Sequence, residues 1–63
     1  MTPSDLTAWR KRLGLNKIRA AEALGCDRGS LSAWEAGTYP IPVYIALACA
    51  ALALGIKGYP SAP

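Results

Sequence analysis

Residues 14–37 decide the fold, and they read GLNKIRAAEALGCDRGSLSAWEAG. Asn16 and Asp27 are residues that commonly cap the start of a helix, and a glycine stands where each of the two helices would end. The pattern therefore predicts two short helices, over about 17–24 and 28–36. The turn between them is only three residues long, and small alanines in the first helix let the second pack closely against it.

A further helix precedes this pair. Because proline is tolerated in a first helical turn, Pro3 predicts a helix that begins at residue 2 or 3 and ends at Gly14. Leu6, Trp9 and Leu13 recur at helical spacing and form one apolar face. The inward-facing residues expected from the next two helices are Ala20, Ala21, Leu24, Leu31 and Trp34.

The last predicted helix, over about 42–54, is opened by Pro42 and ends before Gly55. No charged residue interrupts it, and a helix that is apolar all round must be buried all round. We expect an all-α, compact four-helix domain over residues 1–56 that dimerises through this helix, followed by a flexible tail over 57–63.

The composition excludes several classes of function. The chain has 63 residues, a formal net charge of +3, no histidine and two cysteines that lack metal-ligand spacing. Its four carboxylates are scattered, so we expect no catalytic residues, no metal and no cofactor. The apolar stretch 41–56 is shorter than the about 18–20 residues that a bilayer requires. We expect a soluble, intracellular protein with reduced thiols and no membrane partner; a single disulfide between Cys26 and Cys49 is the alternative. The basic excess points to an anionic partner.

Two helices joined by a short turn with glycine have the geometry of a helix-turn-helix, whose second helix enters a DNA major groove. Here the sequence resembles the Cro/CI-type (Xre-like) family of phage repressors. The matching residues are Gly14-Leu15-Asn16, Ala21, Gly25, Asp27, Ser30-Leu31, Trp34-Glu35 and Gly37. The resemblance implies a lambda-repressor-like fold, double-stranded DNA as partner, and a cytoplasmic location in bacteria. The segments 19–22 and 39–44 are also similar to small anti-CRISPR-associated repressors.

The resemblance assigns four residues of the helix expected over about 28–36 to base contacts: Arg28, Gly29, Ser32 and Ala33. The planar fork of Arg28 suits guanine, although a phosphate contact or a solvated position is the alternative. Gly29 lets the backbone approach DNA, and Ala33 suits a thymine methyl group. Family members usually carry a long polar side chain at the position of Ala33, so we expect DNA shape to carry more of the specificity.

The residues expected to contact phosphates are Asn16, Lys17, Arg10, Ser30, Thr38 and Tyr39. Lys17 stands where the family typically uses glutamine for this contact. Arg10 and Glu35 occupy positions where the family often has an ion pair between the first and third helices. For Tyr39, packing against Pro40 and Trp34 is an equally good interpretation. Both tryptophans are expected in the core.

The last helix has two apolar sides. We expect Val43, Leu47, Ala50 and Leu54 to cover the core. The predicted dimer interface is then formed by Ile45, Ala48, Cys49, Leu52 and Ile56. The alternative is that Tyr44, Tyr59 and the tail of the same chain cover that second side.

These predictions favour a homodimeric repressor that binds a palindromic operator and occludes a promoter, with no small-molecule ligand evident. The alternative is a protein-interaction module, such as an antitoxin-like or phage inhibitor protein, that keeps the fold without specific DNA binding. The small residues at two of the four base-contact positions keep this alternative open.

Overall fold

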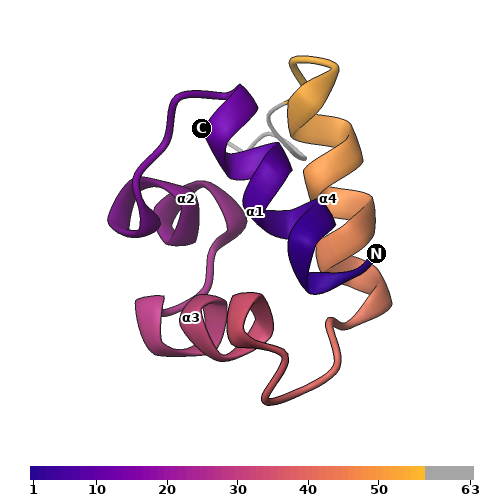
Figure 1. The fold of residues 1–63 in the computed structure, drawn as a ribbon. Helices are drawn as coiled ribbons and strands as arrows, with labels where there is room; N and C mark the ends of the chain where they lie inside the picture. Colours follow the sequence, from indigo (N-terminus) through magenta and orange to yellow (C-terminus); the bar gives the residue numbers. More distant parts are fainter. Residues whose placement is uncertain (57–63) are drawn as a thin grey trace, which may run out of the picture.

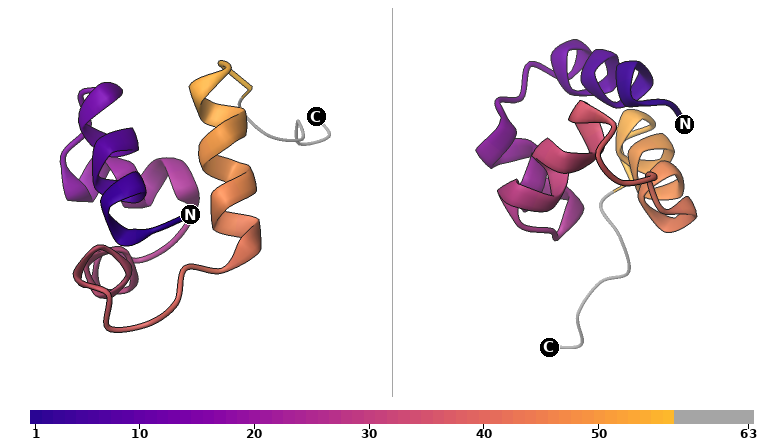
Figure 2. Two further views of the ribbon diagram at one scale, coloured as in Figure 1. Left: turned by 45° about the vertical axis from the view of Figure 1, so that its right-hand side comes forward. Right: turned by 60° about the horizontal axis from the view of Figure 1, so that its bottom comes forward.

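The computed structural model describes residues 1–56, and within this range it contains four helices and no strand. The helices are α1 (Pro3–Arg12), α2 (Lys17–Leu24), α3 (Arg28–Ala36) and α4 (Val43–Ala53). Helix α3 packs against α1 and α2, and α4 packs against both α1 and α2 (Figure 1 and Figure 2). The predicted all-α fold is confirmed, whereas the predicted tail over 57–63 lies outside the described residues. None of the four helices is long and apolar enough to cross a membrane.

Local interactions set the ends of α2 and α3 as the sequence predicts. Asn16 Oδ1 accepts a hydrogen bond from the backbone N–H three residues later at 2.8 Å, and Asp27 Oδ2 does the same at 3.0 Å. Gly25 and Gly37 end the two helices with φ of 72° and 78°, in the left-handed region that favours glycine. Each helix therefore has a defined start and a defined stop, which fixes the tight turn between them.

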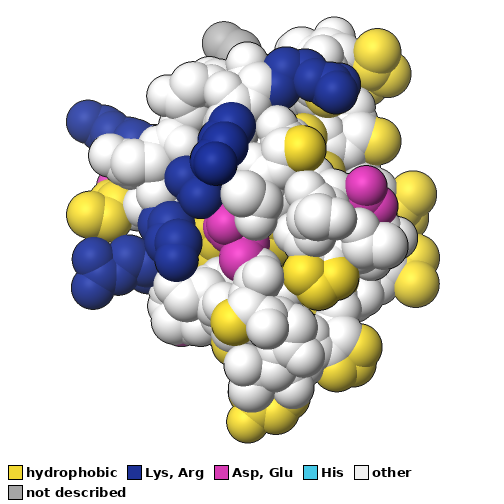
Figure 3. All heavy atoms as spheres, in the orientation of Figure 1, with side chains coloured by type: hydrophobic (Ala, Val, Ile, Leu, Met, Phe, Trp, Pro, Cys, Tyr) yellow, Lys and Arg dark blue, Asp and Glu magenta, His cyan; other side chains and the backbone are white. Residues whose placement is uncertain are grey.

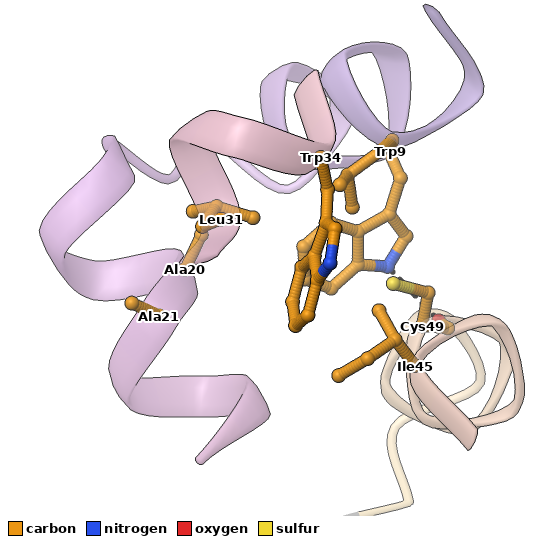
Figure 4. Close-up of a cluster of buried hydrophobic side chains, with 8 residues drawn as sticks. Trp9, Ala20, Ala21, Leu31, Trp34, Ile45 and Cys49 are labelled. Atoms are coloured by element: carbon orange, nitrogen blue, oxygen red, sulfur yellow. Dashed lines mark hydrogen bonds between the residues drawn. The ribbon is translucent and has the colours of Figure 1, made fainter. Parts of the chain in front are cut away.

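The core lies where the four helices meet, and two indoles are part of it. Trp9 reaches from α1 and Trp34 from α3 toward α4 (Figure 4). Trp9 Nε1 donates a hydrogen bond to the backbone oxygen of Cys49 at 2.9 Å, which ties α1 to α4. The buried residues are Leu6, Trp9, Ala20, Ala21, Leu31, Trp34, Ile45 and Cys49. The prediction that both tryptophans belong to the core is confirmed.

The predicted orientation of α4 was wrong. Ile45 and Cys49, expected at a dimer interface, are buried in the core of the single chain, and Leu52 packs half-buried against it. Val43 and Leu54, expected in the core, are 76% and 80% exposed. The cause is that α4 is apolar on every side, so its sequence does not indicate which side faces the core. The side that fits beside the indole of Trp9 is the one that turns inward.

Two smaller predictions have different outcomes. Leu13, expected on the apolar face of α1, is exposed, because the helix ends at residue 12 and Leu13 forms its C-cap. Cys26, in the turn, packs half-buried against the core, as does Leu24. Both cysteines are free thiols, and burial raises the pKa of Cys49 to about 11. A thiol with so high a pKa is an inert part of the core.

Candidate nucleic-acid interface

The N-terminus of α2 and the exposed side of α3 form an open hollow of about 480 Å³. It is lined by Asn16, Lys17, Ile18, Arg28 and Ser32. Two of these side chains are cations, and neither a carboxylate nor a core residue lines the hollow. On the face of the molecule shown in Figure 3, lysine and arginine side chains gather over α1 and α2, while hydrophobic side chains follow the edge formed by α4. The hollow is therefore suited to an anionic surface.

An ion pair joins α1 to the end of α3. Arg10 Nε and Nη2 each donate to one carboxylate oxygen of Glu35 at 3.0 Å, and Nη1 donates to the backbone oxygen of Leu15 at 3.3 Å. The two side chains of the pair are only 15% and 7% exposed. Thr7 Oγ1 adds a hydrogen bond to Glu35 Oε1 at 2.8 Å. This network confirms the expected ion pair and holds α3 at a fixed angle on α1.

The environment of Glu35 changes its pKa. Burial by itself would raise the pKa, because it disfavours the charged carboxylate. The hydrogen bonds from Arg10 and Thr7 and the charge of Arg10 together outweigh this effect, so the pKa lies below its ordinary value of 4.5. Glu35 therefore stays ionised under all ordinary conditions, and its charge is paired.

This shift makes part of the stability dependent on pH. A carboxylate with a lowered pKa in the folded state stabilises the fold fully above its unfolded value of 4.5, and that stability is lost as the pH falls through the lower folded value. We expect the free energy of unfolding to fall more steeply with acidification in the wild type than in Glu35→Gln. Urea unfolding between pH 6 and 2, followed by far-UV circular dichroism, measures both curves.

Two exposed carboxylates provide the baseline for that comparison. Hydrogen bonds from Thr2 and from Ser30 lower the pKa values of Asp5 and Asp27 respectively, and both helix caps act equally in the wild type and the variant. Only the difference between the two curves reports Glu35. Parallel curves would show that the carboxylate contributes nothing specific to acid lability.

The four residues predicted to contact base edges lie on α3, and they differ in exposure and in whether they line the hollow. Arg28 is exposed and lines the hollow together with half-buried Ser32. Ala33 is half-buried. A Cβ at Gly29 would stand 3.0 Å from Asp27 Oδ2, so a larger residue there would press on the helix cap. Their contacts with bases stay predictions.

The six residues predicted at phosphates differ in how many of their donors are engaged. Asn16 and Lys17 line the hollow, whereas Thr38 and Tyr39 are exposed after α3. Tyr39 is 64% exposed, which does not fit the alternative that it packs into Trp34.

Two members of this set have partners within the chain. Ser30 Oγ donates its only proton to Asp27 Oδ1 at 2.7 Å, so we assign Ser30 to the helix cap and leave it out of the proposed phosphate contacts. Arg10 points three of its nitrogens at Glu35 and Leu15. A phosphate contact by Arg10 has to use the N–H groups that these bonds leave over.

Sequence reasoning missed two residues of this region. Thr7, which holds Glu35 from the other side, stands three residues before Arg10 and therefore on the same face of α1; that spacing was a usable signal. Ile18 had no assigned role, yet it lines the hollow beside Arg28. Its signal in the sequence was an aliphatic side chain between the two cations Lys17 and Arg19.

The fold and the hollow define the chain as a helix-turn-helix domain. A family model described as Helix-turn-helix matches residues 6–56, most of the chain, and the chain belongs to this family of Cro/CI-like DNA-binding regulators. The match confirms the resemblance to the Cro/CI-like family. It does not distinguish the anti-CRISPR-associated type from other members, so that assignment stays a prediction. Neither the curated proteins nor the solved structures gave a match.

Proposed function

We propose that this DNA-binding regulator is a homodimeric repressor that binds a palindromic operator and acts by occluding a promoter. The observation that carries the proposal is the hollow between α2 and α3, where Lys17 and Arg28 stand beside an amide and a hydroxyl. Phosphate contacts position a protein on the duplex, and base contacts specify the sequence. Lys17 and Asn16 supply the first kind of contact, and Arg28 at the start of α3 supplies the second.

The exposed side of α4 supports the second part of the proposal. Val43, Leu47, Ala50 and Leu54 are all exposed and follow one another at intervals of four, three and four residues. Intervals that alternate between four and three residues are those of an a/d seam, which packs against a second helix of the same kind. No charge interrupts the seam, and so large an exposed apolar stripe marks an interaction surface. We propose that a second copy of this chain covers it.

The corrected orientation changes the proposed interface. It consists of the exposed seam together with Tyr44 and Ile56, which are 68% and 54% exposed. Ile45 and Cys49 no longer belong to it, because the core of each chain encloses them. A twofold pair of this kind presents two α3 helices to one side of a duplex, about 34 Å apart, which matches half-sites separated by one helical turn.

Equilibrium binding to duplex DNA tests the proposal. We expect Arg28→Ala to weaken the preferred operator by about 1–3 kcal/mol and to relax the preference at one base pair. Lys17→Ala should instead weaken all sequences alike and reduce the slope of log affinity against log salt by about 1. Fluorescence anisotropy against a selected operator and a scrambled duplex, at several salt concentrations, separates the two effects.

Arg12→Ala is the matched control, because Arg12 is an exposed cation at the end of α1 outside the hollow. It should affect neither the sequence preference nor the affinity strongly. An Arg28→Ala protein with unchanged base preference would contradict the role given to Arg28. A wild-type protein that ignores duplex DNA at low salt would contradict the proposed function itself.

That last result would favour the second candidate, a protein-interaction module that retains the fold. The observation behind this candidate is the small size of Gly29 and Ala33, which offer few groups for reading bases. The salt titration decides between the two, since a steep loss of duplex affinity with rising salt is expected only of the DNA-binding protein.

A further inference from the structure

Ile18 occupies an unusual place for an aliphatic side chain. It is the second residue of α2 and is 51% exposed, whereas Ala20 and Ala21 of the same helix are buried in the core. Single exposed aliphatic residues are common and need no explanation by themselves. The relevant observation is that Ile18 lines the same hollow as Arg28 and Ser32, so it forms an apolar wall beside two groups that bind polar atoms.

The chemistry of the major groove offers one partner for such a wall. The groove edges of bases carry hydrogen-bond donors and acceptors, and thymine alone adds a methyl group, at C5. Because Ile18 lines the same hollow as Arg28 and Ser32, a base pair engaged by those two side chains would bring its neighbour toward Ile18. A methyl group there would lose its contact with water on binding, whereas a cytosine would bring a polar amino group against a hydrocarbon surface.

We infer that Ile18 is a specificity-determining residue that reads the C5 methyl group of a thymine next to the base pair contacted by Arg28. The inference rests on the proposed function, because it requires α3 to lie in the major groove. It adds an apolar contact from α2 to the base contacts of α3. It also accounts for specificity in a domain whose α3 carries glycine and alanine at two of its reading positions.

Replacement of thymine by deoxyuridine tests this inference, because it removes only the methyl group. An operator is first selected with the full wild-type chain, and each of its thymines is then replaced symmetrically in both half-sites. We expect one position at which the replacement weakens binding by about fourfold per half-site, the value for one buried methyl group. In Ile18→Ala the same replacement should have no effect, and in Ile18→Val the effect should be kept.

The matched control is Leu13→Ala, which shortens an exposed aliphatic side chain outside the hollow and should keep the full effect of deoxyuridine. Circular dichroism checks that all variants fold. A deoxyuridine effect that persists in Ile18→Ala would assign the methyl contact to another residue, such as Ala33, and overturn the inference. So would an operator in which no thymine is sensitive. In both cases the wild type still binds DNA, whereas complete indifference to duplexes would overturn the proposed function as well.

Discussion

Replacement of Arg10 by methionine is expected to lower the free energy of unfolding by about 3 kcal/mol at pH 7. Methionine keeps most of the aliphatic stem, so the loss reports the guanidinium and not the packing. The physical reason is that Glu35, only 7% exposed, would keep its charge without the partner that donates two hydrogen bonds to it. A domain of this size has about 3–9 kcal/mol of stability in total, so the variant should be largely unfolded by mild denaturant. Urea titration followed by tryptophan fluorescence measures the change.

Two further variants make this prediction specific to the partly buried pair of Arg10 and Glu35. Arg10→Met combined with Glu35→Leu should recover most of the loss, since it removes the stranded charge together with its partner. Arg19→Met breaks the other ion pair of the described residues, at 3.5 Å between side chains that are 71% and 62% exposed, and should cost under about 0.5 kcal/mol. Equal losses for Arg10→Met and Arg19→Met would show that the α1–α3 pair does not hold the fold.

The network around Glu35 shows which kind of information the sequence contains. The caps at Asn16 and Asp27 and the glycines that end α2 and α3 are local signals, and all of them act in the structure as predicted. The ion pair between Arg10 and Glu35 came from the resemblance to a family, because its partners are far apart in the sequence. Local hydrogen bonding can therefore be predicted directly from the sequence, whereas a pair between two helices cannot, because no local pattern links its partners.

The orientation of α4 could not be read from the sequence for a different reason. Ile45 and Cys49 on one side and Leu47 and Leu54 on the other are equally apolar, so periodicity cannot choose between the two sides. The choice depends on three-dimensional packing, in which the indole of Trp9 meets the backbone of Cys49. The existence of a surplus apolar side was predictable, since one small chain cannot bury both sides, but its identity was not.

The orientation of α4 predicts a second large effect, at Leu47 on the exposed side of the helix. Leu47→Glu is expected to convert the proposed dimer to a folded monomer and to weaken operator binding by at least about 100-fold, because each half-site is then bound independently. Leu47 is 66% exposed at the middle of the seam, so glutamate there costs the fold of the single chain little. Across a twofold axis, however, it brings two carboxylates together in an apolar contact. Sedimentation equilibrium measures the mass, and circular dichroism measures the helix content.

Three comparisons separate a lost interface from a lost fold. Ile45→Glu should unfold the chain, because Ile45 is 1% exposed in its core. Ala23→Glu adds the same charge to an exposed site on α2 and should leave the dimer intact. Mixing Leu47→Glu with Leu47→Lys should restore a dimer, since opposite charges then meet across the axis. If Leu47→Glu stays dimeric while Ile45→Glu gives a folded monomer, the interface lies on the opposite side of α4. If the wild type sediments as a monomer at every concentration, the proposed dimer does not exist.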